Sequence, residues 1–203
     1  MYVYGLRNLA KIVDILKLND LRDYYLAEAK AIGDLGKAHC WDEERGLFKE
    51  GPQFDLEYTQ HAQMWAVLTG IVTGNEAAAL MEKALTEPGI IKCTFPLKYY
   101  LFRALEAAGL YEKTDAQWED WKRLLPLNLS TIPETPYDNS RSDCHAWSSL
   151  LLFEYHSQYR APCLTEAGAV FSCRTVQRKS CGEDLSALER YFNGPALQTF
   201  QVQ

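Results

Sequence analysis

The sequence lacks the long apolar run that a membrane helix requires. Nowhere in its 203 residues is there a stretch near the roughly 18–20 uninterrupted apolar residues that span a bilayer. The opening residues, Met1 to Arg7, also lack the basic flank, apolar stretch and small-residue cleavage site of an export signal. We therefore expect a soluble protein that does not contact the membrane.

An excess of basic residues is absent too. The formal net charge is -6, and nucleic-acid binding draws most of its affinity from clustered Lys and Arg, so nucleic acid is not an expected partner. The six cysteines form no dense framework and lack the C-x2-C spacing of zinc sites. They are Cys40, Cys93, Cys144, Cys163, Cys173 and Cys181. We expect free thiols, which favours the cytoplasm, and neither a metal nor another cofactor.

The composition that remains is that of a folded globular protein, with 47% hydrophobic and 24% charged residues. Apolar residues at three- and four-residue spacing predict a helix over Leu6–Leu18, and Asp20 is predicted to cap a second over Leu21–Lys37. Five more helices are expected over residues 57–70, 75–85, 94–109, 114–125 (capped by Thr114 or Asp115) and 143–159. No run of alternating strands is found, so the predicted class is all-α.

The connectors between these helices alternate in length. Long ones (40–55, 87–93 and 126–142) precede the more aromatic and apolar helices, and short ones precede the others. Successive antiparallel helices place alternate connectors at opposite ends of a bundle. We therefore expect a functional face at the long-loop end, with the aromatic helices in the inner ring of a helical toroid.

The most informative stretch is the loop at residues 130–149. Its polar and aromatic side chains converge on one predicted helix start: Glu134, Arg141, Asp143, His145 and Trp147. Pro133 and Pro136 stiffen the backbone on either side of Glu134. Asp143 lies where an N-cap would, so that His145 and Trp147 fall in the first turn. A plainer interpretation is a solvated loop.

In that solvated loop, Arg141 would pair with Asp138 or Asp143. Against this stands a resemblance: residues 131–134 followed by 140–148 are similar to the end of the catalytic domain of bacterial α-L-rhamnosidases, which are inverting glycoside hydrolases built on six helical hairpins. Three earlier segments, Trp41–Phe48, Tyr58–Ala62 and Tyr99–Leu105, resemble the same family in order and spacing. The resemblance covers about residues 20–162 and implies a partial (α/α)6 toroid.

The resemblance also implies roles for individual residues. Glu134 matches the general base, which activates water opposite a general acid about 6.5–9.5 Å away. His145 would contact the sugar, and Arg141 and Asp143 would orient the loop. The further candidates for sugar contact are Trp147, Trp41 and His61, the last of which could equally be a structural histidine. Asp42, Glu43 and Glu44 are expected in a solvated turn, and Trp65, Trp118 and Trp121 in the core.

The family carries its general acid on an earlier loop for which no motif is found here, so little hydrolysis is expected from this chain alone. The predicted organisation is half a toroid over residues 1–162 and a divergent, poorly ordered tail over 163–203. When completed, the domain would hydrolyse terminal α-L-rhamnose. The alternatives are a non-catalytic sugar-binding or scaffold module, and an inactive truncated gene product. Open inner-helix faces of the half-toroid would also favour self-association.

Overall fold

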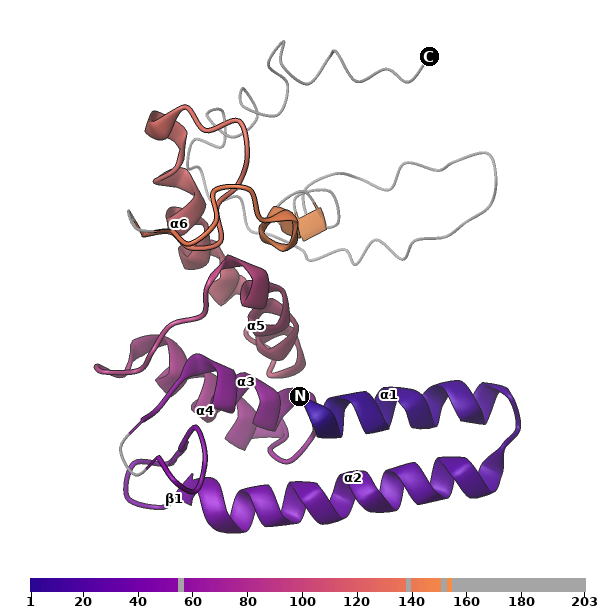
Figure 1. Cartoon of the computed structure of the whole chain (residues 1–203). Helices are drawn as coiled ribbons and strands as arrows, with labels where there is room; N and C mark the ends of the chain where they lie inside the picture. Colours follow the sequence, from indigo (N-terminus) through magenta and orange to yellow (C-terminus); the bar gives the residue numbers. More distant parts are fainter. Residues whose placement is uncertain (55–56, 138–139, 151–152, 155–203) are drawn as a thin grey trace, which may run out of the picture.

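The protein is a series of antiparallel helices joined by loops of unequal length (Figure 1). The computed structural model describes residues 1–54, 57–137, 140–150 and 153–154. Its elements are α1 (Tyr2–Ile15), α2 (Asn19–Cys40), β1 (Trp41–Asp42), β2 (Leu47–Phe48), α3 (Gln60–Leu68), α4 (Gly74–Thr86), α5 (Phe95–Ala107), the 3₁₀ helix η1 (Tyr111–Trp118), α6 (Glu119–Lys122), and the 3₁₀ helices η2 (Leu125–Leu127) and η3 (Ala146–Ser149). The predicted all-α class is confirmed, with one two-residue antiparallel strand pair in the described part.

The first two helices form a long hairpin, which extends away from the other helices in Figure 1. Leu6 of α1 packs against Ala29 of α2. Helix α1 ends tightly because the Leu18 N–H donates to the Val13 carbonyl at 2.9 Å, with Lys17 in the left-handed conformation (φ 62°). Helix α2 therefore begins at once. The prediction that Asp20 caps it is wrong, since Asp20 already lies inside its first turn.

The main core lies between α3, α4 and α5 and is closed by the aromatic residues that follow α5. Its large side chains include Met64, Met81 and Phe102, all fully buried. Trp118 and Trp121 are buried against this core, which confirms their predicted core position. Trp65 is only half-buried and packs between Tyr4 and Tyr100, with ring centroids 5.6 and 4.8 Å away.

Two predicted helices differ from the structure. Thr114 caps no α-helix: it lies inside η1, and its hydroxyl donates to the Tyr111 carbonyl at 2.7 Å. Asp143 is not an N-cap either, because no helical turn begins at it; its carbonyl accepts a hydrogen bond from the Thr131 hydroxyl at 2.5 Å within the loop. The helical turn there, η3, begins after His145 instead. Most of the rest of that predicted helix lies outside the described residues, as does the predicted tail at 163–203.

The cysteines in the described part of the chain are unpaired. Cys40, Cys93 and Cys144 are free thiols, as predicted, while the other three lie outside the described residues. Burial raises the pKa of the Cys93 thiol to about 12, so that it behaves as a small apolar core residue. None of the described helices combines the length and the apolar character needed to cross a membrane.

Candidate functional site

The loop that carries Glu134 is held by backbone hydrogen bonds between its two halves. The Glu134 N–H donates to the Ser142 carbonyl at 2.8 Å, and the His145 N–H donates to the Ile132 carbonyl, also at 2.8 Å. Pro133 lies between these two rungs; it is buried, and it has no N–H to satisfy. The backbone position of Glu134 is therefore fixed by pairing within the loop.

The carboxylate of Glu134 is gripped by the guanidinium of Arg141. Arg141 Nε donates to Oε2 at 3.0 Å and Nη2 donates to Oε1 at 2.5 Å, a bidentate pair. The Glu134 side chain is 14% exposed and that of Arg141 is 84% exposed, so the arginine covers the carboxylate from the solvent side. This contact raises the pKa of Arg141. Arg141 thus pairs with Glu134 rather than with Asp143, and Asp138 lies outside the described residues.

This pairing leaves Glu134 chemically able to bind a further group. A carboxylate oxygen has about two acceptor positions, and the two N–H groups of Arg141 occupy one on each oxygen. The remaining position on each can accept a hydrogen bond from water or from a sugar hydroxyl. The arginine therefore fixes the direction of the carboxylate without using all of its acceptor capacity.

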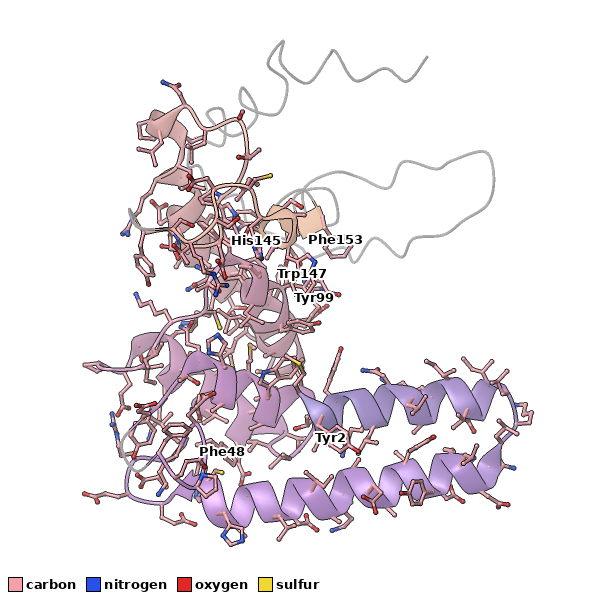
Figure 2. All side chains as sticks on the ribbon, viewed as in Figure 1. Tyr2, Phe48, Tyr99, His145, Trp147 and Phe153 are labelled. Carbon is pink, nitrogen blue, oxygen red and sulfur yellow. The ribbon has the colours of Figure 1, made fainter. Side chains whose placement is uncertain are left out.

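Two rings lie together at the end of this loop. The centroids of His145 and Trp147 are 6.3 Å apart, and the rings meet edge to face at 82°. Trp147 is 78% exposed and His145 is half-buried. Figure 2 shows both near Tyr99 of α5 and Phe153, which pack on each other with centroids 6.1 Å apart. The loop thus presents an open aromatic surface.

A cavity of about 570 Å³ lies against the same loop. This volume is within the range of small-molecule sites. Its walls come from the η2 region and from the loop residues next to Glu134 in sequence, including Leu124, Leu127, Pro133, Thr135, Tyr137 and Asp143. Among the predicted site residues, Asp143 therefore lines this cavity. Glu134 does not line it, but its neighbours in sequence, Pro133 and Thr135, do.

The structure places the two remaining predicted site residues elsewhere. Trp41 of β1 packs on Phe48 at 4.9 Å, and Figure 2 shows Phe48 far from His145. His61, in the first turn of α3, lines a separate cavity of about 400 Å³ together with Glu50. Its Nε2 is buried and has no hydrogen-bond partner among the described residues. Trp41 and His61 are therefore not brought to the Glu134 loop.

One polar cluster was not predicted from the sequence. The expected solvated turn forms, with Glu43 and Glu44 exposed, but Asp42 holds it together. Asp42 accepts hydrogen bonds from the Tyr58 hydroxyl at 2.5 Å and from the N–H groups of Glu44 and Arg45. These bonds lower the pKa of Asp42 and raise that of Tyr58. Arg45 lies 4.2 Å above the Tyr58 ring and pairs with Glu87 at 2.7 Å. The sequence feature that could have predicted this cluster is an aspartate at the start of a tight turn.

Across residues 1–54, 57–137, 140–150 and 153–154, no group of three or more His, Cys, Asp or Glu side chains is arranged to bind a metal ion. The Glu134 loop itself presents a fixed carboxylate, an imidazole and an indole.

The fold is similar to part of two solved rhamnosidases. A rhamnosidase from Klebsiella oxytoca with rhamnose bound matches 75% of this chain and 32% of its own length, with a TM-score of 0.64 and 20% identity. A family 78 glycoside hydrolase, the rhamnosidase of Bacillus sp. GL1, matches 76% of this chain and 18% of its own, with a TM-score of 0.63 and 21% identity.

These two similarities confirm the predicted resemblance to rhamnosidases at the level of the fold. The chain spans about a third of one solved rhamnosidase and less than a fifth of the other. No family model and no curated protein matches the sequence.

Proposed function

We propose that this chain forms part of the catalytic domain of an inverting α-L-rhamnosidase, in which Glu134 is the general base. The observation that supports this best is the bidentate hold of Arg141 on the largely buried Glu134 carboxylate. An inverting hydrolase needs a carboxylate fixed well enough to aim one water molecule at the anomeric carbon. The paired loop backbone and the arginine together supply that fixation.

In this proposal the base acts through its unoccupied acceptor positions. Water donates a hydrogen bond to a Glu134 oxygen and loses its proton to that oxygen as it attacks the sugar, while a general acid on the opposite side protonates the departing oxygen. Arg141 acts as a positioning residue and Asp143 shapes the adjacent cavity. The general acid is supplied from outside the loop, by the part of the domain to which this chain has no counterpart.

The ligand proposed is a terminal α-L-rhamnose of a glycan or glycoside. A 6-deoxyhexose has a methyl group and an apolar face that pack on an indole, and hydroxyls that require polar partners. Trp147 and His145 offer these two kinds of contact side by side. One similar solved rhamnosidase has rhamnose bound, which supports a carbohydrate ligand. Trp41 and His61 take no part in this pocket because they lie at other places.

A second candidate function is a sugar-binding module without catalysis. It is favoured because, among the described residues of this loop, Glu134 is the one carboxylate held by an arginine, and glycoside hydrolysis by inversion requires two carboxyl groups. In that case the exposed Trp147 and its neighbour His145 would bind the sugar, and the Arg141–Glu134 pair would serve only to shape the loop.

The two candidates are separated by one series of measurements. Binding of L-rhamnose to the full chain is measured by calorimetry, and hydrolysis of a nitrophenyl α-L-rhamnoside is followed after the rest of a rhamnosidase toroid is added as a second polypeptide. Glu134→Gln should lower turnover by at least about 10²-fold and change sugar affinity little. Glu119→Gln, which alters a carboxylate in an exposed pair with Lys122, is the matched control.

Turnover that is unchanged in Glu134→Gln would contradict the assignment of the base. Saturable binding with no turnover in the complemented mixture would support the sugar-binding module. Absence of both binding and turnover would contradict the two proposals together.

A further inference from the structure

The α1–α2 hairpin carries more apolar surface than its own packing uses. On α1, one stripe (Val3, Leu6, Ala10 and Val13) is buried against α2. A second stripe at the same three- and four-residue spacing faces solvent, with exposed fractions of 37% at Leu9, 55% at Ile12 and 63% at Leu16. A helix with two apolar stripes needs two neighbours, and α2 is only one of them.

Helix α2 repeats this arrangement. Ala29 and Gly33 are its buried residues, whereas Leu21, Tyr24 and Leu35 are 43–58% exposed. These three lie on one helical stripe. Among the positions that continue this stripe at helical spacing, Glu28 is the charged one. The exposed stripe of α2 is therefore almost entirely apolar as well.

The two exposed stripes lie on the same side of the hairpin. An α-helix turns by about 100° per residue, and on this basis each exposed stripe lies roughly 100° around its helix from the buried stripe. Viewed along each helix from its N-terminus, the rotation from the buried to the exposed stripe has the same direction in α1 and α2. The two helices run antiparallel, so equal rotations bring both stripes to one side of the plane that contains the helix axes. We call this surface the hairpin face and define it by Leu9, Ile12, Leu16, Leu21, Tyr24 and Leu35.

We propose that the hairpin face is the interface through which two copies of this chain associate. Its six side chains are each about half exposed, which leaves several hundred Å² of contiguous apolar surface. A stable interface needs roughly 800 Å² per partner, and the neighbouring Tyr2, which is 68% exposed, extends the face towards that size. A two-helix apolar layer is self-complementary, because two such layers stack into a four-helix bundle with two-fold symmetry.

The charges around the hairpin favour a protein partner over a lipid surface. A helix that binds lipid needs a predominantly basic polar face. Here basic and acidic residues are mixed and pair with each other: Arg22 contacts both Asp14 and Asp23 at 2.9 and 2.8 Å, and Lys30 contacts Asp34 at 2.5 Å. The hairpin face lies outside the Glu134 loop, so the inference does not depend on the assignment of the base. The rest of the toroid, which the proposed function requires, is the competing occupant of this face, and a dimer that this added polypeptide dissociates would show that the face packs within the domain instead.

The experiment is a concentration series of the full chain in sedimentation equilibrium. We expect a dimer that dissociates on dilution, and at least tenfold weaker association in Leu21→Asp and in Ile12→Asp. Helix content should stay unchanged, because both side chains are already exposed in the single chain. Leu26→Asp is a closely matched control: Leu26 is 44% exposed, against 43% for Leu21, but projects from the opposite side of α2.

Several outcomes would overturn the inference. A monomer at all concentrations up to about 100 µM would do so, as would association weakened equally by Leu26→Asp. Binding to phosphatidylcholine–phosphatidylglycerol vesicles in place of dimerisation would identify a lipid partner. A monomer that loses thermal stability on Ile12→Asp would also contradict it, because the face would then be covered within a single chain.

Discussion

Arg103 donates from a single nitrogen, Nη2, to both carboxylate oxygens of Glu154, at 2.7 and 2.8 Å. Glu154 is fully buried, and Tyr111 donates its hydroxyl to the same carboxylate at 2.6 Å. This contact ties α5 and η1 to the chain that continues from η3. It thereby anchors the downstream end of the Glu134 loop to the core.

Loss of the arginine from this contact should be costly. Arg103→Met would leave a buried carboxylate without its cation, and breaking a buried pair in this way costs about 3–5 kcal/mol of unfolding free energy. Tyr111→Phe removes one hydrogen bond and should cost about 1–3 kcal/mol. Urea unfolding at neutral pH measures both. Lys122→Met breaks an exposed pair and should cost less than about 1 kcal/mol of unfolding free energy. An equally small loss of unfolding free energy in Arg103→Met would contradict the buried ion pair of Arg103 and Glu154.

Three helices end in the same backbone motif, so that replacements at its lysine and at its glycines should change the unfolding free energy in opposite directions. Left-handed residues close α1, α3 and α5, namely Lys17, Gly70 and Gly109, with φ of 62°, 68° and 73°. A residue with a Cβ is strained there, so Lys17→Gly should raise the unfolding free energy by about 1 kcal/mol.

Gly109→Ala should lower the unfolding free energy by a similar amount, through backbone strain alone, because a Cβ at Gly109 meets nothing within 4 Å. Gly70→Ala should cost a similar amount, because the atom that its Cβ would approach within 2.7 Å, Arg7 Nη1, is the far end of an exposed side chain that can move away. Thermal unfolding of the three variants checks these changes. A loss of stability in Lys17→Gly would mean that α1 does not end in this motif.

His61 gives a pH dependence of known sign. Burial lowers its pKa below the ordinary value of 6.5, although the Glu50 carboxylate opposes this. As the pH falls below 6.5, the unfolded chain therefore binds a proton that the folded chain resists, and the unfolding free energy decreases. His61→Gln removes this contribution, so the stability of the wild type relative to the variant should fall between pH 7.5 and 5.5.

Urea unfolding at several pH values measures this difference. The exposed His39 on α2, replaced in the same way, controls for the loss of one imidazole. A stability difference between wild type and His61→Gln that stays constant with pH would show that His61 is not held neutral by burial.

Trp147 should report sugar binding directly. It is 78% exposed, so its indole emits as in water, and a sugar packed against the ring would remove water and shift the emission to shorter wavelength. Titration with L-rhamnose should give a saturable shift that is absent in Trp147→Phe and retained in Trp65→Phe. L-mannose, which has a hydroxymethyl group in place of the methyl group, should bind more weakly if the methyl group contacts the ring. A shift that survives in Trp147→Phe would place the sugar elsewhere.

Local pattern was enough to predict the longer helices. Apolar spacing depends on neighbouring residues, and it predicted α1 and α2, with ends that differ from the observed ones by up to four residues. The start of α5, with Pro96 in its first turn, is also found as predicted. The segment after α5 was harder, because Trp118 and Trp121 are three residues apart, a spacing that suits both an α-helix and a 3₁₀ turn. In the structure Trp118 ends η1 and Trp121 lies in α6, and both pack against the core, a division that their spacing alone does not predict.

The candidate site was predictable in its components but only partly in its arrangement. The residues of one loop, such as Glu134 and Arg141, are close in sequence, so their convergence could be expected. Which carboxylate Arg141 contacts depends on how the two halves of the loop pair, and that register is set by backbone bonds rather than by spacing. Trp41 and His61 are distant in sequence, and only the packing of β1 and α3 reveals their separate positions.

The buried lysine of α5 offers a way to follow the opening of this protein. Lys98 is 1% exposed and is enclosed with Asp120 and Gln117, and burial lowers its pKa. An acylating reagent modifies surface amines quickly but can reach Lys98 only when α5 and α6 separate. The slow phase of acylation at this one side chain therefore measures how often the protein opens beside its aromatic core, without any engineered label.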